Sequence, residues 1–589
     1  MKQFFKFMLA SMAGMFAAGF LLIILFLLVV SSMVNGLNDD KQVKLKEHSI
    51  IEISLQGEIK ERTDKNPIDG FGLSGISVNR AVGLDDILNS LKEAKTDSKV
   101  DGILLNLTGI QSGLATLEEI RNALLDFKTS NKFIYSYSEG YSQGAYYLAS
   151  LANKIFLYPE GDIDFKGFHA ELMFFKGTLD KLEVEPEIIR HGKFKSAIEP
   201  FILDKMSPEN RQQTRVFMGS LWNQFISEIS TSRKIDLAQV QSIADNLGAR
   251  SAQAALDAKL VDQLSYYDEV VEELKIKTNI SKNDKLNLVD LKKYARSFLA
   301  TKDFSAQKIA IIYANGDIVS GRGDDDQLSS EKIGEAIRKA RTDSSIKAIV
   351  LRVNSPGGSA LASDVIWRET ILAKKAKPLV VSMGDYAASG GYYISCSADK
   401  IVAEPTTITG SIGVFGLMFN AQKLFNNKLG ITFDTVRTGN HANIGSTTYP
   451  MTADERAIIQ EGVEKIYDTF ITHVAQGRKM DKASVDSIGQ GRVWSGTDAK
   501  RIGLVDEIGG IDKAISIASK LAGIDKFRTI SYPEQKDFIK QIFEDFGDDV
   551  RVKYGQQDFE AAYKYYKEFQ SVLQTKGVQA RLPFTLKIR

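Results

Sequence analysis

Short apolar runs alternate with amphipathic stretches through the second half of the chain. Residues 308–313, 348–353 and 378–383 are rich in β-branched side chains and are bounded by turn or helix signals, which is typical of buried strands. Between them, residues 330–342 and 360–373 carry apolar side chains at helical spacing. The order strand, helix, strand, helix, strand predicts a largely parallel sheet covered by helices, which is an α/β fold.

The N-terminal residues follow a different pattern. No charged residue occurs between Phe7 and Asn38, and residues 20–30 are continuously apolar. About 20 apolar residues suffice to cross a bilayer, so this segment predicts a transmembrane helix. The residues after it offer only a weak cleavage site, which favours an uncleaved signal anchor over a removed signal peptide. Lysines lie on both sides of the segment, so charge leaves its orientation open.

The sequence contains two related halves. Residues 140–148 align with residues 386–394 at an offset of 246 positions, and the same offset relates 94–98 to 340–344. Upstream the first copy holds extra residues around 64–75, which predicts a surface loop. Two long copies indicate a tandem domain duplication rather than a solenoid. We therefore divide the chain into an anchor (1–48), a first repeat (49–300), a second repeat (301–525) and a C-terminal tail (526–589), in which 559–574 favours a helix.

Composition narrows the classes of function. The 589 residues are 43% hydrophobic, enough for two substantial cores. The net charge is +1 and no basic stripe with interleaved aromatics occurs, so a nucleic-acid partner is set aside. The single cysteine, Cys396, rules out an intrachain disulfide and a cysteine-rich metal site. None of the five histidines lies in a His-Glu-x-x-His arrangement, which disfavours a zinc protease.

The two copies differ in the polar residues that could carry chemistry. At the centre of the alignment the second copy has Ser389 where the first has Gln143. Ser389 follows the third predicted strand and precedes a helix, where partial positive charge and free N–H groups favour a developing anion. The alternative is that the serine only caps the helix, a role for which serine is also preferred.

A second loop favours catalysis over capping. Gly357 and Gly358 follow the second predicted strand, and two adjacent glycines let backbone amides approach a substrate carbonyl. They are the candidate oxyanion hole. The first copy has Gln111 and Ser112 at the matching positions, so it lacks both the serine and the glycine pair.

A nucleophilic serine needs a base. Lys195 of the first copy faces Ala442 of the second in the alignment, and a buried lysine can become a neutral proton acceptor. Two alternatives remain at this point. Lys195 could be a solvated loop residue, and a histidine triad could use His441 or His191 with Asp385 as the orienting acid.

Several separated motifs resemble one peptidase family. Residues 194–201 followed by 206–208, together with 354–358, 388–393 and 409–414, are similar to segments of the long-form signal peptide peptidases, also called protease IV. The resemblance implies two tandem Clp-protease/crotonase-like domains behind a transmembrane helix, and no cofactor or metal. It implies Ser389 as nucleophile, Lys195 as general base and Ser411 as the residue that orients the lysine. Neither repeat is then expected to be active alone.

The same resemblance implies surroundings and substrates. The catalytic body is expected on the periplasmic side of the cell inner membrane, as a homotetramer that degrades signal peptides left after preprotein cleavage. Apolar residues beyond Ser411 are candidates for substrate lining or for ordinary core packing: Phe415, Leu417, Met418 and Phe419. Two other functions are weighed against proteolysis, an acyl-coenzyme A enzyme of the crotonase type and a non-catalytic membrane scaffold.

Overall fold

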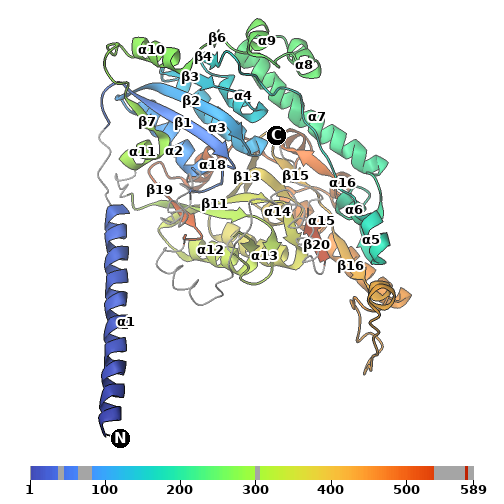
Figure 1. Ribbon diagram of the computed structural model, residues 1–589. Helices are drawn as coiled ribbons and strands as arrows, with labels where there is room; N and C mark the ends of the chain where they lie inside the picture. The colour runs from blue at the N-terminus through green and yellow to red at the C-terminus, as the bar shows by residue number, and fades with distance from the viewer. Residues whose placement is uncertain are drawn as a thin grey trace.

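The computed structural model describes residues 2–37, 45–63, 82–298, 305–324, 326–535 and 578–581. Within them the two repeats each form a helix-covered sheet, and a third, smaller sheet joins the repeats (Figure 1). The predicted loop at 64–75 and the predicted helix at 559–574 lie outside the described residues.

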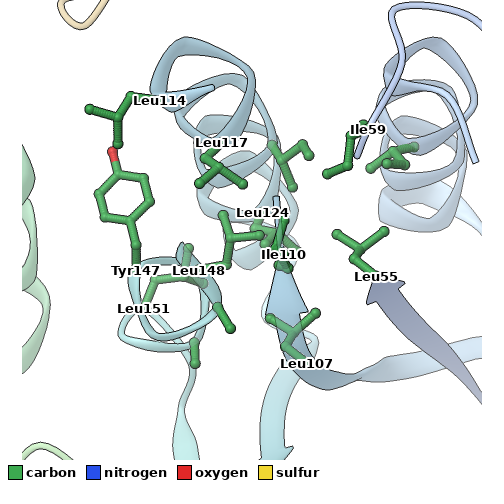
Figure 2. Packing of buried hydrophobic residues seen from close by; sticks show 14 of the residues in the cluster. Leu55, Ile59, Leu107, Ile110, Leu114, Leu117, Leu124, Tyr147, Leu148 and Leu151 are labelled. Carbon is green, nitrogen blue, oxygen red and sulfur yellow. The ribbon is translucent and has the colours of Figure 1, made fainter. Parts of the chain in front are cut away.

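The first repeat is built on a parallel sheet with the strand order β6-β4-β3-β2-β1-β7. Its strands are β1 (Ser49–Gly57), β2 (Val100–Ile110), β3 (Phe133–Ser138), β4 (Lys154–Leu157), β6 (Gln263–Leu264) and β7 (Leu288–Asp290). Its helices are α2 (Leu84–Thr96), α3 (Leu114–Lys128), α4 (Gln143–Ala149), α7 (Pro208–Arg233), α8 (Leu237–Asp245), α9 (Ala252–Asp257), α10 (Tyr267–Lys277) and α11 (Leu291–Phe298). Figure 2 shows apolar side chains of α3 and α4 packed over the ends of β1 and β2.

The second repeat has the predicted strand and helix order. Its main sheet runs β17-β15-β13-β11-β8-β19, with β14 and β18 alongside, and every pairing is parallel except that of β15 with β17. The strands are β8 (Lys308–Asn315), β11 (Ile346–Ser355), β13 (Leu379–Ala388), β14 (Lys400–Ala403), β15 (Ile408–Gly410), β17 (Val493–Ser495), β18 (Glu507–Ile508) and β19 (Arg528–Tyr532). The helices are α12 (Ser330–Thr342), α13 (Ala360–Ala376), α14 (Gly390–Ser395), α15 (Ala453–Arg478), α16 (Lys482–Ile488), α17 (Gly496–Arg501) and α18 (Ile511–Ala522). The sequence-based expectation of a largely parallel α/β sheet is confirmed.

The third sheet draws strands from distant parts of the chain. Its order is β10 (Leu328–Ser329), β9 (Ile318–Val319), β12 (Gly357–Ser359), β20 (Val578–Arg581), β16 (Phe415–Asn420) and β5 (Glu185–Arg190). β5 belongs to the first repeat, whereas its partner β16 belongs to the second. The segment after β5 contains a 3₁₀ turn (Ser196–Ile198) and α6 (Glu199–Ile202), with α5 (Lys176–Leu182) before it, and a π-helix (Leu424–Leu429) follows β16. This sheet therefore brings a segment of the first repeat against the second.

The duplication is visible in matching hydrogen bonds. The hydroxyl of Tyr146 in α4 donates to the Leu260 carbonyl at 2.8 Å. At the equivalent place in the second repeat, the hydroxyl of Tyr392 in α14 donates to the Leu504 carbonyl at 2.9 Å. The two copies thus share a buried tyrosine bond that fixes the short helix after the third strand.

A buried ionic cluster ties the repeats together. Arg352 on β11 is fully buried and pairs with two carboxylates of the first repeat, Glu61 at 2.8 Å and Glu119 at 2.6 Å. Glu61 also accepts a hydrogen bond from the Asn354 side chain at 3.0 Å, and Asn354 in turn accepts one from the Tyr386 N–H at 3.1 Å. A buried charge that loses its partner is strongly destabilising, so this cluster fixes the first repeat against β11 and β13.

The predicted anchor segment is helical. The helix α1 covers Lys2–Leu37 and contains the apolar run at 20–30. Among the residues that the structure describes, no helix is both long and apolar enough to cross a membrane. The transmembrane part of the prediction is therefore not confirmed.

Candidate active site

Ser389 occupies a strained turn between β13 and α14. Its backbone has φ 56° and ψ −113°, a region that costs a non-glycine residue energy and that is common where a nucleophile is held on a sharp strand-to-helix turn. Its N–H donates to the Gly410 carbonyl at 2.8 Å, which fixes the turn against β15. The side chain makes no capping hydrogen bond to α14. The capping interpretation of this serine is therefore wrong.

Lys195 from the first repeat lies against this serine. Its Nζ is 2.8 Å from Ser389 Oγ, 3.1 Å from Ser411 Oγ and 3.2 Å from the Ser411 carbonyl oxygen. All three residues are fully buried. Burial lowers the pKa of Lys195 from 10.5 to about 7, because the charged amine is removed from water. The interpretation of Lys195 as a solvated loop residue is wrong, and the amine is poised to accept a proton near neutral pH.

Residues of both repeats hold the lysine segment in place. Gln213 of α7 donates from Nε2 to the Phe194 carbonyl at 3.0 Å and to Ser196 Oγ at 3.1 Å, bracketing Lys195 on both sides. From the second repeat, Gly491 approaches so closely that a Cβ there would lie 2.6 Å from Lys195 Cα. Neither Gln213 nor Gly491 was expected from the sequence to hold the lysine segment. The glycines at 489 and 491 carried a signal for a close approach, whereas nothing marked Gln213.

The glycine pair lies beside the turn that carries Ser389. Gly357 has φ 104° and Gly358 has φ 156°, so both adopt backbone conformations that glycine tolerates best. A Cβ at Gly357 would lie 2.8 Å from the backbone nitrogen of Gly390, the residue after the serine. The Gly357 N–H donates to Ser355 Oγ at 3.2 Å. Gly390 opens α14, and an N–H in the first turn of a helix has no partner within that helix, so the Gly390 N–H is a further candidate donor to an oxyanion, which no sequence motif indicated.

The histidine alternative does not survive the geometry. The Asp385 carboxylate accepts hydrogen bonds from the Thr116 N–H at 2.9 Å and the Thr116 hydroxyl at 2.7 Å, so it joins the repeats instead of orienting a histidine. His191 stacks on Tyr467 with ring centroids 3.9 Å apart. His441 lies 3.4 Å from an exposed carboxylate of residue 454. A serine–histidine triad through these residues is therefore wrong.

The apolar residues after Ser411 divide between two environments. Phe415 and Leu417 are buried in a small cluster with Leu179, Ile198 and Phe201 of the first repeat, as the core-packing interpretation expects. Met418 and Phe419 are half-buried and line a small surface hollow near Met451.

Comparison with known proteins identifies the family. The sequence pattern of "Peptidase family S49" matches residues 126–281 and again residues 371–525, once in each repeat. The chain belongs to this family. It is 39% identical to "Protease 4" of Salmonella typhi over 82% of this chain and 79% of that protein. It is also 35% identical to "Protease 4" of Haemophilus influenzae, over 85% of this chain and 83% of that one.

A third relative extends the comparison to plants. The "Serine protease SPPA, chloroplastic" of Arabidopsis thaliana is 32% identical over 82% of this chain and 70% of that protein. The S49 chain is therefore a serine protease. Among solved structures, a ClpP1 mutant from Listeria monocytogenes matches 36% of this chain at 15% identity and a TM-score of 0.24.

Proposed function

We propose that this S49 peptidase is a membrane-anchored endopeptidase whose Ser389 and Lys195 form a catalytic dyad that degrades remnant signal peptides and other apolar peptides. The observation that carries the proposal is the 2.8 Å distance between Lys195 Nζ and Ser389 Oγ, with both residues fully buried. Each residue comes from a different repeat. The division explains why the first repeat keeps the lysine and the second keeps the serine.

The chemistry follows from the protonation state of the amine. Neutral Lys195 accepts the Ser389 proton as the hydroxyl oxygen attacks the peptide carbonyl, and the resulting ammonium protonates the leaving amine. Water then attacks the acyl-enzyme and loses a proton to Lys195, and the ammonium returns this proton to Ser389 Oγ as the acyl bond breaks and the acid product leaves. Ser411 supports this cycle by accepting hydrogen bonds from Nζ, which directs the amine toward Ser389.

The carbonyl oxygen becomes negatively charged in the tetrahedral intermediate, so it needs hydrogen-bond donors near it. The backbone N–H groups around Gly357, Gly358 and Gly390 lie next to Ser389 and are the proposed oxyanion hole. Gly357 in this state exchanges its bond to Ser355 Oγ for one to the oxyanion.

The resemblance to the long-form signal peptide peptidases supports the rest of the proposal. Under it, each repeat has a Clp-protease/crotonase-like fold, and the helix α1 anchors the chain in the cell inner membrane. The catalytic body would then face the periplasm and assemble as a homotetramer. An anchored protease of this kind meets apolar peptides where they are left, in the same membrane.

The test compares variants in the hydrolysis of a hydrophobic peptide ester and of casein. Ser389→Ala and Lys195→Ala should each lower kcat by at least about 1000-fold, because each removes a group that acts in bond breaking. Lys193→Ala is the matched control, since Lys193 is exposed and only two positions away, and it should hydrolyse within about twofold of the wild type. Equal rates for all four proteins would refute the dyad.

A further inference from the structure

The loop at residues 489–492, which joins α16 to β17, contacts both the dyad lysine's segment and the serine that orients the lysine. The Gln490 carbonyl accepts a hydrogen bond from the Phe194 N–H at 3.0 Å, directly before the lysine. The Arg492 carbonyl accepts one from the Ser411 N–H at 2.7 Å. One short loop of the second repeat therefore sets the backbone on both sides of the contact between the lysine and its orienting serine.

The same loop is closely packed and strained. The Gly491 N–H donates to the Ile412 carbonyl at 2.7 Å. A Cβ at Gly413 would lie 2.8 Å from Gly491 and 3.4 Å from Lys195 Cδ, so the stem of the lysine is closely enclosed here. Gln490 has φ 53°, which is uncommon for a non-glycine residue and persists where the surroundings enforce it. The conformation of the loop therefore depends on contacts from outside it.

Tyr467 of α15 supplies such a contact. Its hydroxyl accepts a hydrogen bond from the Gln490 N–H at 3.2 Å and donates one to Asp486 Oδ1 of α16 at 2.5 Å. The Tyr467 side chain is buried, and its ring stacks on His191 in the segment that leads to Lys195. Tyr467 therefore touches both the 489–492 loop and the lysine segment.

The first repeat has kept this bond but changed its chemistry. Residues 470–471 align with 225–226 at an offset of 245, which pairs Tyr467 with Trp222 and Asp486 with Gln241. Trp222 Nε1 donates to Gln241 Oε1 at 2.7 Å, as the tyrosine hydroxyl donates to Asp486. An indole N–H cannot accept a hydrogen bond, whereas a hydroxyl donates and accepts at once. A group that can also receive a loop N–H thus occurs in the repeat that carries the serine.

Two properties of Lys195 depend on the loop staying in place. Its Nζ has to remain within reach of Ser389 Oγ, now at 2.8 Å. Nζ contacts two neutral serines, Ser389 and Ser411, so it is the exclusion of water that keeps its pKa low. When the loop shifts, Gly491 no longer covers the lysine backbone, water reaches the amine and the pKa rises toward 10.5.

We propose that Tyr467 is a positioning residue for catalysis: its hydroxyl, bonded to Asp486, fixes the 489–492 loop in the conformation that keeps Lys195 enclosed and directed at the serine. The proposal rests on the proposed function of the Ser389 and Lys195 site. It adds to that site a residue that acts through the loop.

The kinetic test removes one oxygen atom. Tyr467→Phe keeps the ring on His191 and should lower kcat at least about tenfold with KM within about twofold, because a misplaced base slows the chemical step and not peptide binding. The pH at which kcat/KM reaches half of its plateau should rise by about one unit, because water reaches Lys195. Asp486→Asn still offers an oxygen to the hydroxyl and should keep kcat within about threefold of the wild type.

Tyr146→Phe is the matched control, since it also removes a buried tyrosine hydroxyl and its hydrogen bond, but from α4 of the first repeat. It should lower the denaturation midpoint about as much as Tyr467→Phe and leave kcat and the pH profile unchanged. A purely structural role of Tyr467 would give the two variants the same kinetics.

The pKa of Lys195, measured by NMR in protein with isotope-labelled lysine, separates this proposal from the proposed function. In a Ser389→Ala background, Tyr467→Phe should raise that pKa by about one unit, and Tyr146→Phe should not change it. Equal pKa values and equal kcat for the two phenylalanine variants would overturn the positioning role, even if hydrolysis depends on Ser389. Hydrolysis that persists in Ser389→Ala, with the expected rise in pKa, would instead overturn the dyad and leave the effect of Tyr467 on the lysine.

Discussion

Replacing Lys195 with methionine should make the protein inactive and, at neutral pH, more stable. Methionine is unbranched and apolar and can follow the path of the lysine stem. The pKa of Lys195 falls from 10.5 to about 7 in the folded protein because of burial. Each pKa unit corresponds to about 1.4 kcal/mol, so burying this amine lowers the free energy of unfolding by about 5 kcal/mol at pH 7 and below.

Lys195→Met avoids this loss of stability, but other lost interactions offset part of the gain in the free energy of unfolding. The substitution also removes the hydrogen bonds that Nζ makes to Ser389 and Ser411, each worth about 1 kcal/mol. A net stabilisation of about 3 kcal/mol is therefore expected for Lys195→Met at pH 7. Lys193→Met, at an exposed position, should change the free energy of unfolding by less than about 0.5 kcal/mol.

The pH dependence of this difference tests its cause. Between pH 7 and 10.5 the unfolded chain carries the Lys195 proton and the folded protein does not, so wild-type stability rises with pH in this window. The effect of burial is complete below pH 7 and disappears above 10.5. Guanidinium unfolding of both proteins should show the advantage of Lys195→Met shrinking by about 3 kcal/mol from pH 7 to pH 9. A difference that does not change with pH would refute the assignment of the low pKa to this lysine.

The rate of catalysis should follow the titration of Lys195, since only its neutral amine accepts a proton. The value of kcat/KM for a peptide ester should rise about tenfold per pH unit up to pH about 7 and stay level above it. A level profile from pH 5 to 7 would contradict this expectation. Gly491→Ala places a Cβ 2.6 Å from Lys195 Cα and should lower kcat at least about 100-fold in steady-state assays, whereas Gly462→Ala, which meets nothing within 4 Å, should leave kcat unchanged. Glu61→Gln removes one of the two carboxylates on Arg352 and should lower the free energy of unfolding by about 3 kcal/mol in denaturant titrations; a loss under 1 kcal/mol would show that the pair contributes little.

The C-terminal tail contributes strands that no sequence motif predicted. In the sequence, the only element predicted within residues 526–589 is a helix at 559–574. In the structure, Arg528–Tyr532 form β19, which pairs with β8 as β7 pairs with β1 in the first repeat, and Val578–Arg581 complete a sheet beside Ser389. Strand pairing uses backbone groups, so almost any side chains are compatible with it and the sequence carries little trace of it.

The sequence by itself determined the main helices and strands of the second repeat and the candidate active-site residues. Apolar periodicity predicted β8, β11 and β13 and the helices between them, because strand and helix repeats are local properties. The comparison of the two copies singled out Ser389, the glycine pair and Lys195, since a duplicated domain shows which polar residues each copy kept.

Only the tertiary structure decided which of these residues meet. Lys195 and Ser389 are 194 positions apart, and no local pattern states the distance between them. The low pKa of the lysine depends on burial by both repeats, which is a collective property of the packing. Arg352 was an ordinary residue in the sequence, and the partners of Arg352 and Gly491 became apparent only when the repeats came together. The reason is physical: local sequence sets backbone conformation, whereas the environment of a buried group is set by segments that are remote along the chain.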